Sequence, residues 1–148
     1  MKTTGYIIMV GGSLTVVSLF LAWGTFNAGL GSPMNYNAWD MNKFFTEWEG
    51  TMNFIASFGL YFLLVFGVFS VLETLLNEFK PDYYKGKFGL WMIFNGAVII
   101  IFSLICVVQT DSIKMFSAGV GAYLGIIGGI LVTVGGYLDY NGKLEHIF

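Results

Sequence analysis

The stretch that decides the fold is FSAGVGAYLGIIGGILVTVGGYL, residues 116–138. It is apolar, and small residues recur in it at every fourth position: Ser117, Gly121, Gly125, Gly129 and Thr133. On an α-helix, residues four apart lie on nearly the same face. Inside a membrane, small residues let helix backbones approach closely, whereas packing larger apolar side chains gains little over their contact with lipid. The stretch therefore predicts a membrane helix that packs against another helix.

The composition of the whole chain agrees with a membrane protein. Of the 148 residues, 56% are hydrophobic and 11% are charged, and the mean hydropathy is +0.73. Soluble domains carry about 25% charged residues. The net charge is −2 and every basic residue is a lysine, which disfavours a nucleic-acid partner, an arginine voltage sensor and a bidentate phosphate site. We expect residues 1–148 to form a single transmembrane domain.

Four apolar runs are long enough to be transmembrane helices. They cover about residues 6–23, 52–76, 88–108 and 116–138, with an outer loop at 24–51. A helix needs about 20 apolar residues to cross a hydrocarbon core of about 30 Å. The first run lacks a clear small-residue cleavage site, so we expect it to be retained and not removed as a signal peptide. The predicted fold class is an all-α membrane protein, a four-transmembrane-helix bundle.

The lysines predict how this bundle is oriented. Five of them fall on one side of the four spans, namely Lys2, Lys80, Lys85, Lys87 and Lys143, and two fall on the other, Lys43 and Lys114. Cytoplasmic loops carry the excess of basic residues. We therefore expect a multi-pass protein, of the cell membrane if the source is prokaryotic, with both the N- and C-termini in the cytoplasm.

Small residues also mark faces of the other predicted helices. Gly89, Gly96 and Ser103 recur at seven-residue intervals in the third run, a spacing typical of left-handed packing seams. The glycines of the fourth run have two interpretations. They pack the helices of this chain on one another, or they form a face for a partner chain.

Two polar residues within the spans carry a functional hypothesis. Glu73 lies about one turn before the predicted cytoplasmic end of the second span, and Asn95 lies at a similar depth in the third. One interpretation makes Glu73 an interfacial anchor and Asn95 a packing residue. The other makes Glu73 a carboxylate that handles protons or cations, with Asn95 as its hydrogen-bonding partner.

The outer loop predicts a short amphipathic helix. In the segment 37–48, apolar residues recur at roughly helical spacing, and Asn37 is a suitable N-cap. The helix lies on the outer membrane surface or caps the bundle. Its aromatic residues, Trp39, Phe44, Phe45 and Trp48, form a docking surface for a partner in one interpretation. In the other they anchor the helix at the interface without a ligand.

No cofactor or metal site is expected. Asp40, Glu47 and Glu49 match no metal-ligand spacing, and no histidine accompanies them. We expect His146 to be solvated in the C-terminal tail, and Cys106 to be part of a packed apolar surface. The sequence presents no motif that ties the chain to a known family.

The function expected from these patterns is a non-catalytic structural or accessory subunit of a multi-subunit membrane complex. Its partners are then membrane lipids and other membrane subunits, in a hetero-complex more readily than in a homo-oligomer. The alternative is a homo-oligomeric small channel or transporter that uses Glu73 and Asn95. A lipid-modifying enzyme is the least favoured hypothesis, because no nucleophile or acid–base pair is evident at the interface.

Overall fold

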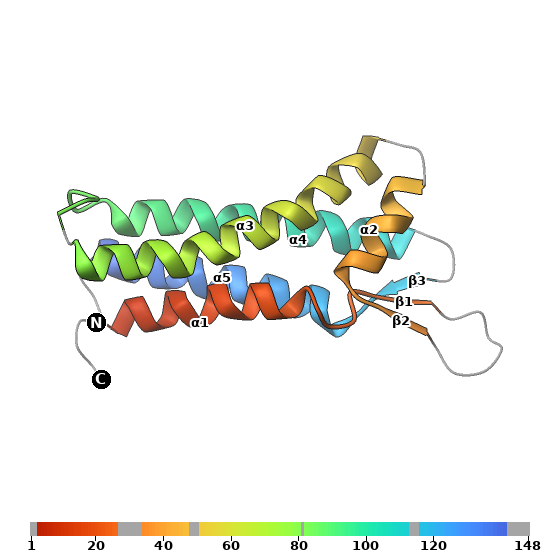
Figure 1. The fold of residues 1–148 in the computed structure, drawn as a ribbon, viewed down its shortest axis with the longest axis horizontal. Coiled ribbons are helices and arrows are strands. Elements are labelled where there is room, and N and C mark those ends of the chain that lie inside the picture. The colour runs from red at the N-terminus through yellow and green to blue at the C-terminus, as the bar shows by residue number, and fades with distance from the viewer. Residues whose placement is uncertain (1–2, 27–33, 48–50, 81, 113–115, 142–148) are drawn as a thin grey trace.

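The computed structural model describes residues 3–26, 34–47, 51–80, 82–112 and 116–141; within them, the side chains of 44–47, 51–54, 57 and 112 are not described. The chain is mostly helical (Figure 1). Its elements, in chain order, are α1 (Thr3–Ser18), β1 (Gly24–Phe26), β2 (Met34–Tyr36), α2 (Ala38–Glu47), α3 (Thr51–Phe79), α4 (Phe88–Ser112), β3 (Phe116–Ala118) and α5 (Val120–Tyr140).

Three of these helices are long enough and apolar enough to cross a membrane. The candidate spans are Phe58–Phe79 in α3, Phe88–Asp111 in α4 and Val120–Tyr140 in α5. By length and composition, they support an integral membrane protein. The fourth apolar helix, α1, has 16 residues, which gives about 24 Å at about 1.5 Å per residue. Alone it is shorter than a hydrocarbon core of about 30 Å.

The helices form a bundle in which α5 and α3 each pack against both α1 and α4. The beginning of α1, the α3–α4 turn and the end of α5 lie at one end of this bundle (Figure 1). The three strands and α2 lie at the other end. We call these the turn end and the sheet end.

Glycine pairs bring α5 into backbone contact with its two neighbours. A Cβ atom added at Gly128 of α5 would lie 2.6 Å from the carbonyl oxygen of Gly11 in α1, and one added at Gly11 would lie 2.6 Å from that of Gly128. In the same way, a Cβ atom added at Gly136 of α5 would lie 2.7 Å from the carbonyl oxygen of Gly89 in α4. Since only glycine leaves room for these approaches, the glycine positions determine where the helices cross.

The residues of the four-residue ladder lie between helices of this chain. Gly125 faces the Oγ atom of Ser103 on α4 and the ring of Trp23, each 3.1 Å from an added Cβ. A Cβ atom added at Gly129 would lie 2.8 Å from side-chain atoms of Ile99 and Ile100 of α4. Thr133 donates a hydrogen bond to the Gly129 carbonyl at 2.9 Å. Its side chain also packs against Gly96 of α4. Within the described residues, these positions therefore contact α1, α4 and the segment that follows α1.

Ser117 departs from this pattern and corrects the sequence analysis. It lies in β3 and is exposed, so it is not part of the helical face, and α5 begins at Val120 instead of residue 116. The reason is a three-stranded antiparallel sheet with the order β2-β1-β3, in which Ser117 pairs with Thr25 and Phe116 with Phe26. The predicted all-α fold class therefore lacked the small sheet that the structure has at the end of the bundle.

The first span also differs from its expected bounds. Helix α1 ends at Ser18 and a turn follows it, where expectation had a helix to residue 23. Trp23 then folds back into the core, and its indole Nε1 donates a hydrogen bond to the Ser18 carbonyl at 2.6 Å. Its ring covers Gly121 and Gly125, at 2.7 Å and 3.1 Å from added Cβ atoms. This indole fills the space that the two glycines leave.

The amphipathic helix of the outer loop is confirmed. Helix α2 spans Ala38–Glu47, and the Asp40 backbone N–H donates to the Asn37 side-chain oxygen at 3.0 Å, which makes Asn37 the N-cap. Ala38 and Met41 are buried. Met41 packs on Gly24 of β1, and α2 also packs on α3. The helix thus caps the sheet end of the bundle.

Candidate functional site

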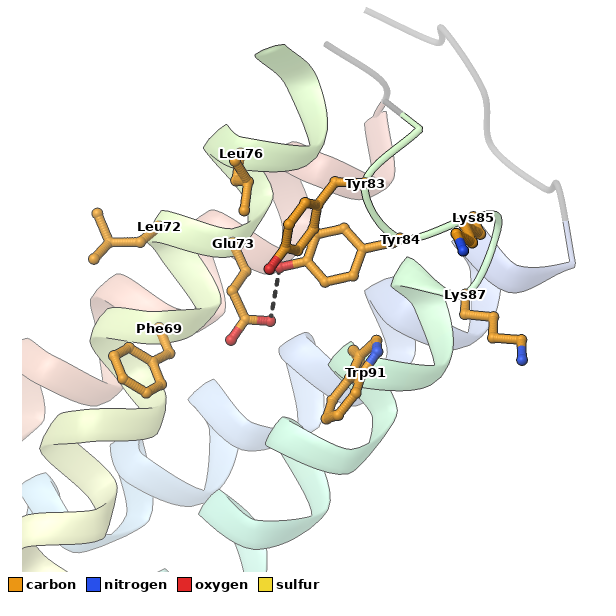
Figure 2. A pocket seen from close by; sticks show the side chains of 9 residues that line it. All are labelled: Phe69, Leu72, Glu73, Leu76, Tyr83, Tyr84, Lys85, Lys87 and Trp91. Atoms are coloured by element: carbon orange, nitrogen blue, oxygen red, sulfur yellow. Dashed lines mark hydrogen bonds between the residues drawn. The ribbon is translucent and has the colours of Figure 1, made fainter. Parts of the chain in front are cut away.

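A groove opens at the turn end, between the second half of α3, the turn at 82–87 and the first turns of α4. Its volume is about 620 Å³, within the range of about 300–1,000 Å³ that is typical of small-molecule sites. Figure 2 shows the side chains around it. Apolar residues of α3 and Trp91 of α4 form its walls, and Glu73, Tyr84, Lys85 and Lys87 provide its polar groups.

The turn between α3 and α4 sets the positions of the two lysines. Backbone hydrogen bonds from Lys85 to Asp82 at 3.2 Å and from Lys87 to Tyr84 at 3.0 Å close successive tight turns. Lys85 and Gly86 both have positive φ angles, 52° and 79°. Glycine adopts this left-handed conformation readily and lysine adopts it at a cost. The turn brings Lys85 and Lys87 to the beginning of α4, where the candidate span starts.

Glu73 is half-buried in the groove and accepts a hydrogen bond from the turn. The Tyr84 hydroxyl donates a hydrogen bond to its Oε2 atom at 3.2 Å (Figure 2). Burial, and next the adjacent Glu73 carboxylate, raise the pKa of Tyr84 above its ordinary value. The phenol therefore stays protonated, and remains a donor, at neutral pH.

Asn95 lies beside this pair, in agreement with the depth expected from the sequence. It is on α4, 2% exposed, and within interaction range of the Glu73 side chain. Its Nδ2 atom nevertheless makes no hydrogen bond with the residues that the structure describes. The two polar residues are thus neighbours without a formed hydrogen bond. A buried amide that lacks a partner is energetically costly. The packing around Glu73 and Asn95 is therefore less favourable than that at the glycine contacts of α5.

A second cluster, of aromatic residues, lies at the sheet end. Trp39 of α2 stands between Phe20, which follows α1, and Tyr61 of α3, with ring centroids 6.2 Å and 6.0 Å away. We call these three residues the aromatic cluster. Phe20 is 61% exposed and Tyr61 is 51% exposed. The other predicted docking residues cannot be placed with it, because the side chains of Phe44 and Phe45, and all of Trp48, lie outside the described residues.

The remaining candidates do not form a site in the described part of the chain. No group of three potential metal ligands occurs among those residues. Asp40 is described, whereas the side chain of Glu47, all of Glu49 and His146 lie outside. Cys106 is buried, as expected, and its Sγ atom lies 3.6 Å from the Ala56 carbonyl oxygen.

Sequence reasoning missed three residues that matter to these sites. The turn at 77–87 reads as an ordinary interfacial turn, so the bond from Tyr84 to Glu73 has no sequence signal beyond two adjacent tyrosines. Trp91 is 52% exposed, although it is one turn inside the third span. Trp23 reads as the last residue of the first span, yet it is a core residue.

The chain matches no protein-family model, and no curated protein or solved structure shows significant similarity to it.

Proposed function

We propose that this protein is a non-catalytic structural or accessory subunit of a multi-subunit membrane complex. The observation that supports this most is the aromatic cluster of Phe20, Trp39 and Tyr61. Three separate segments of the chain contribute to it, and the cap formed by α2 holds Trp39 in place. Large, rigid aromatic side chains dominate the binding energy of protein interfaces.

The position of the aromatic cluster favours a protein partner over lipid alone. Phe20 lies near the end of the first apolar run, Trp39 lies in the capping helix α2, and Tyr61 lies near the beginning of a candidate span. The cluster is therefore at or beyond the membrane boundary, where exposed apolar surface is costly unless it is covered. An interfacial anchor is the competing interpretation, because aromatic belts occur at the same depth.

Purification from the native membrane in a mild detergent tests the proposal. We expect native mass spectrometry to show the chain in a hetero-complex of fixed stoichiometry. The variant Tyr61→Ala should release the partner, because it removes an exposed ring of the cluster. The control Tyr123→Ala removes an equally exposed ring of α5 and should leave the complex intact. A monomer in the unsubstituted protein, or equal loss in both variants, would count against the proposal.

The alternative function is a homo-oligomeric small channel or transporter. One observation favours it, the proximity of Glu73 to Asn95, whose amide lacks a partner in the described structure. Intramembrane ionisable residues often mark ion pathways. Ion flux into liposomes containing the purified chain is the test. This function predicts flux that Glu73→Gln abolishes, whereas flux that the substitution leaves unchanged would remove Glu73 from any pathway.

We also propose that four helices cross the membrane and that the turn end faces the cytoplasm. Helix α1 lies along α5 within the bundle (Figure 1). The apolar residues after Ser18 lengthen the segment that could cross the membrane. Lysines gather at the turn end, as positive-inside orientation requires. Cysteines introduced by Lys85→Cys and Ser117→Cys should react with an impermeant maleimide from opposite sides of sealed vesicles. Reaction of both from the same side would contradict this topology.

A further inference from the structure

We propose that the turn-end groove binds one anionic phospholipid, with its phosphate between Lys85 and Lys87 and its two acyl chains on either side of Trp91. This inference goes beyond the proposed function, because it concerns the chain itself whether or not it belongs to a complex. It rests on the shape of two adjoining grooves, on the placement of the two lysines and on the depth at which they lie.

The two lysines supply the positive charge that a lipid phosphate would need. Both line the groove, and both lie just before Phe88, where the candidate span of α4 begins. If the candidate span crosses the membrane, this is the level of lipid headgroups. Among the residues that the structure describes, neither lysine is held in an ion pair. Basic residues at this level attract anionic lipid.

The surface below the lysines is shaped for acyl chains. A second groove, of about 510 Å³, is lined by Lys87, Leu90, Trp91 and Phe94. It shares Lys87 and Trp91 with the first groove, which continues past Phe69 and Leu72 of α3. Two largely apolar channels thus begin at one lysine and pass on either side of one indole. A phospholipid, with one phosphate and two acyl chains, has the matching form.

Glu73 does not cancel the charge of the lysines. In Figure 2 its carboxylate is directed towards Tyr84, on the side of Trp91 away from Lys87. The groove carries two positive charges and one negative charge, a net charge of +1 that a phosphodiester of charge −1 would neutralise. A zwitterionic lipid has no net charge, so it would leave the net charge of +1 in the groove unchanged. The site is therefore expected to prefer an anionic headgroup.

Native mass spectrometry of the full chain tests the headgroup. The detergent-solubilised protein is mixed with phosphatidylglycerol or phosphatidylcholine of identical acyl chains. We expect one phosphatidylglycerol to be retained with an affinity about tenfold above that of phosphatidylcholine. The double variant Lys85→Gln/Lys87→Gln should lose this preference. The control Lys80→Gln, which removes an exposed lysine of the same connection outside the groove, should keep it.

Three further measurements separate lipid binding in the groove from loss of fold and from binding of phosphate alone. The charge-conserving double variant Lys85→Arg/Lys87→Arg should keep the preference, because it retains both positive charges. Leu72→Trp, a substitution on the exposed face of α3, should fill the groove and reduce retention of either lipid. Inorganic phosphate in excess should not displace the lipid, because the acyl chains supply much of the binding. Equal retention of both lipids by the unsubstituted protein, displacement by phosphate, or an unchanged preference in the glutamine double variant would overturn the proposal.

Discussion

The two sides of the bundle are held together in different ways. Where α5 meets α1 and α4, glycine pairs bring the helix backbones into contact. Where α3 meets α4 at the turn end, the groove opens beside the Glu73–Tyr84 bond and the Asn95 amide, whose nitrogen has no hydrogen-bond partner among the described residues. The first region is built for rigid packing. The second contains the groove for which we propose a lipid ligand.

The most disruptive way to test this contrast is Gly128→Leu. Its Cβ would lie 2.6 Å from the Gly11 carbonyl oxygen and 3.0 Å from the Thr15 backbone nitrogen, and neither atom can move without displacing α1. We expect the chain to lose its native bundle, as far-UV circular dichroism and size-exclusion chromatography in detergent would record. Ile127→Leu, on the exposed face of α5, serves as the control. A native elution profile for Gly128→Leu would refute the close crossing.

Trp23→Ala should come next in severity. The substitution empties the space beneath Gly121 and Gly125 and removes the hydrogen bond to the Ser18 carbonyl. A buried tryptophan replaced by alanine costs about 3–5 kcal/mol of the free energy of unfolding. Unfolding by titration with sodium dodecyl sulfate would measure the loss. Trp91→Ala is the matched control, because Trp91 is half-exposed. Equal losses in the two variants would contradict the difference between the two regions.

Gly125→Leu should be milder than Gly128→Leu, although both belong to the same helix. Its new side chain meets side-chain atoms, the Oγ of Ser103 and the ring of Trp23, instead of backbone. Side chains can yield, and overpacking of this kind costs about 1–3 kcal/mol. The same titration gives the ranking. If Gly125→Leu were as damaging as Gly128→Leu, the distinction between backbone and side-chain contacts would not hold.

How much of the structure can be predicted from sequence also differs between the two regions. The four-residue spacing of Gly121, Gly125 and Gly129 indicates a packed face, because close helix approach depends on residue size alone. The same spacing wrongly predicted that Ser117 belongs to the helical face. Residues 116–118 instead form a strand that pairs with residues 24–26, which are distant in the chain. Periodicity within one segment carries no information about such a contact.

The turn-end groove is harder to foresee for a related reason. Glu73 and Asn95 can be matched in depth by counting along two helices. The bond from Tyr84 to Glu73 joins the turn to a helix residue eleven positions earlier, so it depends on how the turn folds back towards α3. A sequence shows that a turn is present, but the direction of each side chain in it follows from the tertiary arrangement.

Tyr84→Phe tests that bond with a small expected effect. The substitution removes the hydroxyl that donates to Glu73 in the described structure, and a hydrogen bond of this kind contributes about 0.5–1.5 kcal/mol, or somewhat more if its acceptor is charged. We expect a loss of about 1 kcal/mol in the free energy of unfolding. Tyr83→Phe is the control, since Tyr83 is exposed in the same turn. Identical stabilities for the two variants would mean that the bond contributes nothing.

Asn95→Leu should have the smallest effect, and its sign is informative. The Asn95 amide nitrogen is buried with no hydrogen bond in the described structure, so its removal forfeits little and relieves an unfavourable burial. Replacement by an apolar side chain of similar size should leave stability unchanged or raise it slightly. Gly96→Leu, the next position, should by contrast be severe, because Thr133 and the α5 backbone occupy that space. A loss of more than about 2 kcal/mol for Asn95→Leu would show that the amide has a partner in the membrane. Asn95 would then belong with the rigid region of the bundle, and the boundary between the two regions would move towards Glu73.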